Sequence, residues 1–304
     1  MEVQSERGVK KVLLKLETSI NNGDYYEAHQ MYRTLYFRYL AQKKYNETLQ
    51  LLYNGSFLLL QKEQYTSGAE LGILFIDVLV KADEKPSQSH FQKIITLLSM
   101  MTPTLAEREV YIQKALQWSI TGTNYKNGHP YFHRRLAQVF WNEKNYQMAK
   151  QHFMYTKDGS GCASMIIEIH SQHGYSNEID LFIARIVLQY LCLHNKASAD
   201  EAFKTYVSQH PQIQGGPPFI LPLLNFIFFL LKTIEMRKLS LFTYLCEQYQ
   251  PCLSKDPSFF EYLERISQLF FGVKAMNDNR RGGVFGSFLQ SLFNNLEEDD
   301  MDDK

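Results

Sequence analysis

The sequence predicts an all-α fold, an α-solenoid of about seven stacked helical hairpins of the tetratricopeptide-like kind. Three observations support this: a residue pattern that recurs every twenty positions, apolar periodicity close to that of a helix, and the lack of any alternating run long enough to require a sheet. The chain has 304 residues, of which 45% are apolar and 21% charged, as in globular proteins.

An aromatic, a small and a bulky residue recur at offsets 0, +3 and +7. The pattern occurs at Tyr25, Ala28 and Tyr32, at Tyr45, Thr48 and Leu52, at Tyr65, Gly68 and Gly72, and again at Tyr146, Ala149 and Phe153. The first three copies start twenty residues apart, the length of one helix and one turn, so two copies form a hairpin of about 40 residues. We expect the small residue to let a neighbouring helix approach and the tyrosines to pack chiefly between helices.

Capping and turn residues mark the ends of about fourteen helices expected between residues 8 and 273. Predicted caps are Asp24 with Glu27, Thr104 with Glu107, and Asp256 with Pro257 at the first helical position.

The helices are expected to form one solenoid over residues 1–275, with an N-terminal part near 8–155 and a C-terminal part near 156–275. Residues 276–304 are predicted to be a flexible tail that is disordered in isolation. The tail has a glycine-flanked apolar stretch and the acidic end EEDDMDDK. In the apolar stretch, one helical face would hold Phe285, Phe288, Leu289 and Leu292.

Composition argues against several function classes. The formal net charge is zero, and no basic stripe suggests a nucleic acid partner. The spacings of Cys162, Cys192, Cys246 and Cys252 fit neither a disulfide framework nor a zinc site. The apolar run from Phe219 to Leu231 contains a proline and an asparagine and is shorter than the roughly 20 residues that a spanning helix needs. We expect a cytosolic protein that does not insert into membranes.

No motif for catalysis is found: the sequence lacks a phosphate loop, a nucleophile elbow and a dinucleotide fingerprint. His129 and His133 are four apart, but Pro130 in the first turn predicts that His129 caps the helix instead of binding a metal. His170 and His173 are expected to be packing or exposed residues. We therefore expect no enzyme, no catalytic residue, no cofactor and no metal.

The first helix is amphipathic. Its apolar stripe consists of Val9, Val12, Leu13, Leu16 and Ile20, and its basic side of Arg7, Lys10, Lys11 and Lys15, with Leu14 as an apolar anchor. The basic side is either a solvated outer face or a docking strip for an acidic partner.

Residues 219–231, in contrast, are apolar on every side, and a helix of that kind must be covered all round. The cover is either the chain's own helices and tail or a second polypeptide.

Several long strings resemble those of one known family, the Golgi-to-ER traffic protein four family, in its animal branch. They are GDYYEAHQMYRTLYFRYL, GHPYFHRRLA, VLQYLCLHNKASA, GPPFILPLLNFIFFLL, LCEQYQPCLSKDP and EYLERISQLFFGV, and the resemblance extends from about Gly8 to Val273. Members are α-solenoids that form the helical subunit of the cytosolic transmembrane-domain recognition complex.

The resemblance implies a non-enzymatic adaptor for the targeting of tail-anchored membrane proteins to the endoplasmic reticulum, with a role in the quality control of exposed hydrophobic segments. The N-terminal helices would recruit a nucleotide-bound targeting ATPase. The C-terminal half would hold a BAG-type triage scaffold and, directly or through it, a ubiquitin-like protein. In this chain the stretch SQHPQIQGGPPF (208–219) is too short and proline-rich for the β-hairpin with which some relatives clamp the ubiquitin-like protein.

Under this resemblance, the residues expected to dock the ATPase are Arg7, Lys10, Lys11, Leu14, Lys15, His29 and Arg33. The residues expected to dock the scaffold are Phe219, Leu223, Phe226, Phe229, Leu230, Phe242, Leu245 and Tyr249. Two alternatives stay open: a generic tetratricopeptide-like co-chaperone that binds a peptide in its concave groove, and, with the least support, a hydrolase on a helical scaffold. The co-chaperone would need inward-facing lysines and asparagines at repeating positions, which the sequence does not reveal.

Overall fold

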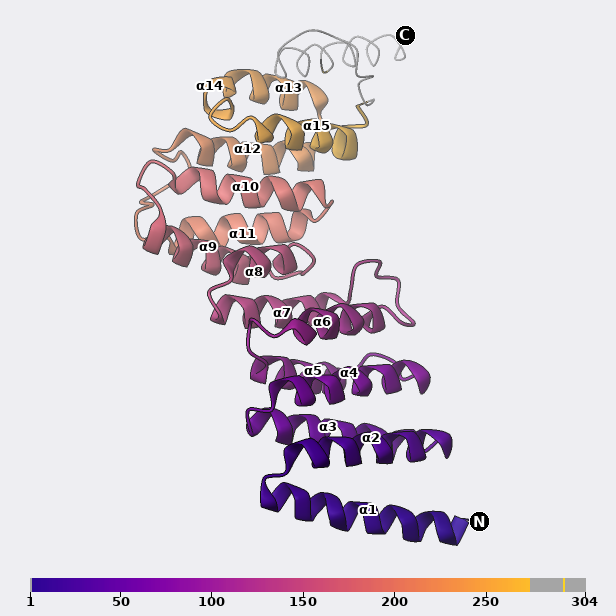
Figure 1. Cartoon of the computed structure of the whole chain (residues 1–304). Coiled ribbons are helices and arrows are strands. Elements are labelled where there is room, and N and C mark those ends of the chain that lie inside the picture. Colours follow the sequence, from indigo (N-terminus) through magenta and orange to yellow (C-terminus); the bar gives the residue numbers. More distant parts are fainter. Residues whose placement is uncertain (1, 274–291, 293–304) are drawn as a thin grey trace. The chain divides into compact units, whose positions relative to one another are not determined.

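The structure, a computed structural model, describes residues 2–273 and residue 292, with side chains described from residue 11 onward. Fifteen helices and no strand lie in this part of the chain (Figure 1). The contacts divide the chain into two compact units that meet at residues 144 and 145. The helix over Tyr146–Phe153, which falls in the predicted N-terminal part near 8–155, belongs to the second unit.

The first unit contains seven helices. They are α1 (Glu2–Asn22), α2 (Tyr25–Ala41), α3 (Tyr45–Gln61), α4 (Tyr65–Lys81), α5 (Gln88–Met100), α6 (Ala106–Ser119) and α7 (Pro130–Asn142). From α1 to α6, helices adjacent in the chain contact each other, and so do helices two positions apart, such as α3 with α5, α4 with α6 and α5 with α7. This is the packing of stacked helical hairpins, and it confirms the α-solenoid.

The twenty-residue pattern is confirmed by the helices it predicts. Helices α2, α3 and α4 each have 17 residues and begin at Tyr25, Tyr45 and Tyr65. The small position lies inside the unit each time: Ala28 and Thr48 have no exposed surface, and Gly68 is buried. A Cβ added to Gly68 would lie 2.7 Å from a Leu60 side-chain carbon, so this position sets how closely α3 and α4 approach.

The turns between these helices repeat as well. One residue in each turn has a left-handed backbone. Before α2, α3 and α4 it lies two residues ahead of the helix, with φ of 82° at Gly23, 55° at Lys43 and 59° at Glu63. In the turn after α4 it is Asp83, with φ of 54°. The next amide then donates to a carbonyl five residues back, as Lys44 does to Tyr39 at 3.0 Å. This arrangement satisfies carbonyls that the helix end leaves free.

Both predicted capping boxes are wrong. Asp24 stands before α2, but its side chain makes no capping hydrogen bond, and Glu27 instead accepts one from Ser19 of α1 at 3.2 Å. Thr104 is not a cap, because α6 begins after Leu105. At the third predicted cap the helix begins one residue later than expected, and Asp256 Oδ1 accepts a hydrogen bond from the Ser258 amide at 3.0 Å.

The second unit contains eight helices among the described residues. They are α8 (Tyr146–Phe153), α9 (Gly159–His173), α10 (Ile179–Cys192), α11 (Lys196–Gln209), α12 (Pro222–Met236), α13 (Leu239–Gln248), α14 (Gln250–Leu253) and α15 (Ser258–Phe271). Helix α10 lies in the interior of the unit and contacts α9, α11, α12 and α15. Its apolar surface on several sides therefore packs within the unit.

The stretch before α12 contains no β-hairpin, as expected. Residues 210–221 form a connection with φ of 70° at Gly215 and 118° at Gly216, followed by a cis peptide bond between Pro217 and Pro218. The predicted tail, with Phe285, Phe288 and Leu289, lies outside the described residues, apart from Leu292, which is fully buried.

Candidate docking surfaces

The apolar stripe of α1 faces the rest of the first unit. Leu16 is 5% exposed, and Val12 and Ile20 pack against the hydrophobic core. Leu13 lies at the edge of the stripe and is more exposed. The amphipathic reading of this helix is thus correct where side chains are described.

The opposite side of α1 presents Lys11 and Lys15, both exposed, together with Leu14, which is 67% exposed. Neither lysine has an ion-pair partner among the described residues. The side chains of Arg7 and Lys10 lie outside the described part.

His29 and Arg33, expected on the docking face, make contacts within the unit instead. His29 is 4% exposed, and its Nε2 lies 3.2 Å from Glu70 Oε2. Burial lowers the pKa of His29, against the opposing effect of the Glu70 carboxylate. Arg33 remains partly exposed, but its Nη1 is 3.0 Å from Glu70 Oε1, so its charge is already paired. His29 is therefore a packing residue, which corrects its assignment to a surface.

The predicted scaffold-docking set does not form one open face. The residues in the interior are Leu223, Phe226, Leu230, Phe242 and Leu245. Helix α12 contacts α10, α11, α13 and α14, so the chain itself encloses most of its apolar surface. The buried members of the set stabilise the second unit and cannot meet a partner without unfolding it.

Three members of the set keep exposed surface: Phe229 is 43% exposed, and Phe219 and Tyr249 are half-buried. Phe219 borders a cavity of about 360 Å³ between α11, the connection before α12 and α12 itself. Its apolar lining includes Phe203, Phe228 and Leu231. An apolar hollow of this size is open in the second unit, although the helix beneath it is largely covered.

Local contacts hold Phe219 in place. Its amide donates to Asn225 Oδ1, and Asn225 Nδ2 donates back to its carbonyl, both at 2.7 Å. The Phe219 ring meets Phe203 edge to face, with centroids 6.0 Å apart. Gly216 also has to be a glycine, because an added Cβ would lie 2.2 Å from the Phe219 ring. The cavity wall is therefore built before any ligand arrives.

The structure also shows the surroundings of the cysteine and histidine residues considered for other chemistries. The four cysteines are free, and burial raises the pKa of Cys162 to about 12, which disfavours a nucleophilic thiolate. His129 caps α7, as predicted, by accepting a hydrogen bond from the Tyr131 amide. No group of metal-ligating side chains occurs among the described residues. Nor is any described helix both long and apolar enough to cross a membrane.

A buried histidine pair in the second unit was not predicted. The Gln212 amide donates to His210 Nδ1 at 3.2 Å, which leaves the proton of the neutral ring on Nε2. That Nε2 is 3.0 Å from His170 Nδ1, and His170 Nε2 is 3.0 Å from the Tyr175 carbonyl. Every ring nitrogen thus has a partner when both rings are neutral. Burial, followed by the neighbouring His170, lowers the pKa of His210 to about 4.

Comparisons with known proteins agree with this architecture. The family model described as Golgi to ER traffic protein 4 matches residues 42–296. A curated relative from Oryzias latipes, "Golgi to ER traffic protein 4 homolog", is 48% identical over 98% of this chain and 92% of its own length. The Homo sapiens homolog is 46% identical over 96% and 89%. The crystal structure of C. therm. Get4 superposes with a TM-score of 0.79 at 25% identity, covering 94% of this chain and 96% of that one. The chain belongs to the Golgi to ER traffic protein 4 family.

Proposed function

We propose that this protein is a non-enzymatic adaptor in the post-translational targeting of tail-anchored membrane proteins to the endoplasmic reticulum. Family membership over nearly the whole chain carries the proposal, since relatives named for Golgi to ER traffic share 46% to 48% of its residues. The adaptor works in the cytosol and bridges a nucleotide-bound targeting ATPase to a BAG-type triage scaffold. A ubiquitin-like protein joins directly or through that scaffold, and the complex also takes part in the quality control of exposed hydrophobic segments.

The basic side of α1 supports the ATPase half of the bridge. Lys11 and Lys15 lack partners among the described residues, and Leu14 between them offers an apolar anchor. Exposed charges of one sign steer an oppositely charged partner and fix its orientation, while an apolar side chain adds affinity on docking. Arg7 and Lys10 extend this strip in the sequence.

The cavity beside Phe219 supports the scaffold half. Its aromatic walls and its volume of about 360 Å³ suit one or two apolar side chains of an inserted segment. Phe229 adds exposed apolar surface on α12. Polar groups at the rim, among them Lys232 and Glu235 paired at 3.2 Å, would surround the inserted segment and keep water from it.

Charge reversal tests the ATPase contact. The variant Lys11→Glu with Lys15→Glu should capture much less ATPase in a pull-down with non-hydrolysable nucleotide, and it should retain the scaffold. The matched control reverses Lys43 and Lys62, two other exposed lysines of the first unit. Equal loss in both variants would mean that overall charge acts, and retention of the ATPase by the α1 variant would show that α1 is not the docking face.

The scaffold contact needs variants on residues that keep exposed surface. Substituting Phe226 or Leu230 would test folding instead of docking, because both are fully buried. Phe228→Asp, at a half-buried residue that lines the cavity, should release the scaffold with an unchanged circular dichroism spectrum and ATPase capture. Phe229→Asp is the matched control on the same helix, since Phe229 is 43% exposed and does not line the cavity. If Phe228→Asp keeps the scaffold at full strength, the cavity beside Phe219 is not its site.

A further inference from the structure

A groove follows α8 and α10 in the second unit, and its lining residues are different from those of the Phe219 cavity. It consists of two adjoining hollows of about 390 and 560 Å³, which share Gln147 and Lys150 of α8 as a common wall. Helix α10 contributes Leu181, Arg185 and Gln189, three successive turns of one face. The groove therefore extends along α10 and is more than a single pit.

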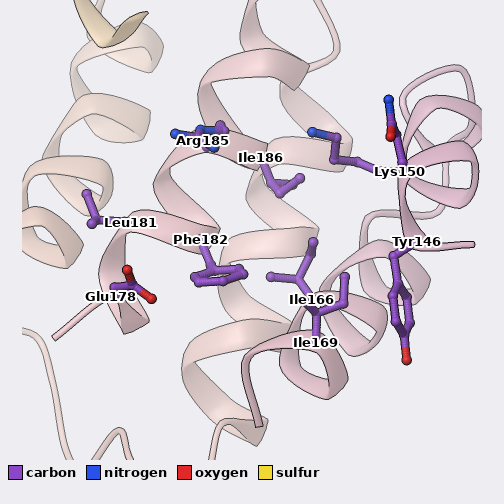
Figure 2. A pocket seen from close by; sticks show the side chains of 10 residues that line it. Tyr146, Lys150, Ile166, Ile169, Glu178, Leu181, Phe182, Arg185 and Ile186 are labelled. Atoms are coloured by element: carbon purple, nitrogen blue, oxygen red, sulfur yellow. The ribbon is translucent and has the colours of Figure 1, made fainter. Parts of the chain in front are cut away.

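Apolar side chains form the walls of the first hollow. Figure 2 shows Ile166 and Ile169 of α9 gathered beside Phe182 and Ile186 of α10. At the edge, the Tyr146 hydroxyl donates to Glu168 at 2.7 Å, which fixes that ring. The walls come from α8, α9 and α10, and α9 packs against both of the others, so the hollow is preformed for an apolar ligand group.

Lys150 brings a free positive charge into this setting. Its side chain is half-buried, and its ammonium group has no hydrogen bond or ion pair with the described residues. The neighbouring cation, Arg185, is already paired with Asp256. Burial lowers the pKa of Lys150, and repulsion from Arg185 lowers it further. A partly desolvated ammonium without a counterion costs stability, and a bound carboxylate would offset that cost.

Gln189 supplies a second unfilled position. Its Nε2 donates to the Tyr262 hydroxyl at 3.1 Å, whereas its Oε1 is buried and has no hydrogen-bond partner. Buried polar atoms are nearly always paired, so an exception inside a groove indicates a missing donor. After a rotation of the Gln189 side chain toward the groove, a backbone N–H of a bound chain would satisfy it. The groove thus lacks one anion and one donor, next to an apolar hollow.

We propose that this groove binds an extended peptide segment of a partner protein in which one acidic side chain is flanked by apolar residues. Lys150 takes the carboxylate, Gln189 Oε1 takes a backbone N–H, and the hollow around Phe182 takes an apolar side chain. From Leu181 to Cys192, α10 rises by roughly 16 Å, which matches about five residues of extended chain. The site goes beyond the bridging function and adds a peptide-binding site to the second unit.

The chain's own acidic end is a poorer match to this groove. Residues 296–304 contain six acids, whereas the groove offers one unpaired cation. The surplus carboxylates would meet Glu178 at the groove edge and Asp256 beside Arg185, and like charges repel. A segment with a single acid fits the local charges better, which favours a partner protein.

Selection from a random dodecapeptide phage library on the full-length protein tests the proposal. We expect enrichment of peptides with one acid flanked by apolar residues. Synthetic copies, measured by fluorescence polarisation, should bind Lys150→Met about ten- to a hundredfold more weakly than the unchanged protein. Lys157→Met, at an exposed lysine outside the groove, is the matched control and should leave affinity unchanged. Methionine fills a similar volume without charge, so Lys150→Met should melt no lower than the unchanged protein.

Replacing the peptide's acid by its amide completes a double-mutant cycle. The amide peptide should lose affinity for the unchanged protein and lose nothing further with Lys150→Met. Three results would overturn the proposal: no enrichment, affinity unaffected by Lys150→Met, or selection that succeeds only after residues 293–304 are deleted. The last would show that the chain's own acidic end occupies the groove.

Discussion

The two units use helices differently. In the first, α2, α3 and α4 have the same length, start at the same residue type and end in the same left-handed turn. In the second, helix length ranges from 4 residues in α14 to 15 in α9 and α12, and a connection over residues 210–221 interrupts the array. Helices of the second unit border hollows of about 360, 390 and 560 Å³.

This difference teaches where each unit can bind. The first unit presents its candidate site on an outer face, where Lys11, Leu14 and Lys15 project from α1. The second offers preformed apolar hollows around Phe219 and Phe182. Docking on the first unit should therefore depend on charge, and docking on the second on apolar burial.

The largest expected effect concerns the enclosure of α12. Phe226→Ala should lower the free energy of unfolding by about 3 to 5 kcal/mol, because it empties a fully buried site. Phe229→Ala on the same helix should cost about 1 kcal/mol or less, since that ring is 43% exposed. Denaturant unfolding of both variants measures the difference. Equal costs would contradict the distinction between a covered helix and an open hollow beside it.

Acidification should destabilise the second unit through His210. Its pKa in the folded chain is about 4, below the ordinary value of 6.5, so in that interval the unfolded chain binds a proton that the folded chain does not. The contribution of the neutral His210 to the free energy of unfolding is complete when the pH is above the ordinary histidine pKa. It decreases as the pH is lowered, by about 2 kcal/mol between about pH 7 and pH 5. Urea unfolding across that interval measures it.

A control is needed because His29 in the first unit also has a lowered pKa and could contribute to the pH dependence. His210→Gln keeps a donor toward His170 and should reduce the pH dependence. His173→Gln, at an exposed position, should not. An unchanged slope in His210→Gln would exclude the pair as the cause.

The repeated turns of the first unit predict a smaller gain. Glu63 adopts φ of 59°, which costs a side-chain-bearing residue free energy that glycine avoids. Glu63→Gly should raise the free energy of unfolding by about 0.5 to 1 kcal/mol, while Gly23→Ala should lower it by a similar amount. No atom lies within 4 Å of a Cβ built on Gly23, so that loss would be purely conformational. Thermal unfolding distinguishes the two signs, and a shared sign would contradict the common turn geometry.

The smallest stability effect is expected on α1. The variant Lys11→Glu with Lys15→Glu should change the free energy of unfolding by about 0.5 kcal/mol or less, since both side chains are exposed and unpaired among the described residues. Its ATPase capture should nevertheless fall sharply. A large loss of stability would mean that these lysines serve the fold and would leave the docking result uninterpretable.

The sequence predicted the helical array well, because periodicity and turn residues are local signals. Tyr25, Tyr45 and Tyr65 mark the first residue of three helices, and Pro130 identified the cap at His129. The capping boxes failed at Asp24 and Thr104, where tertiary contacts or a shifted helix start decide the outcome.

Candidate sites were harder to predict, since burial depends on neighbours far away in the chain. In an amphipathic helix such as α1, the period of the apolar residues alone indicates which side is exposed. Leu14 could therefore be predicted to lie on the exposed side. In a helix that is apolar all round, the period does not indicate which side is exposed. The sequence therefore could not distinguish the buried Phe226 from the exposed Phe229. Lys150 follows the small residue of a repeat copy, but only the positions of α9 and α10 show that its charge lacks a partner.

Binding measured against salt concentration tests the division between the units most directly. Between about 50 and 500 mM NaCl, exposed charge pairs are increasingly screened, whereas apolar contacts are not weakened. The affinity for the targeting ATPase should fall steeply, and the affinity for the BAG-type scaffold should stay constant or rise. An ATPase affinity that ignores salt, or a scaffold affinity that falls in parallel with it, would contradict a charged site on α1 and an apolar site beside α12.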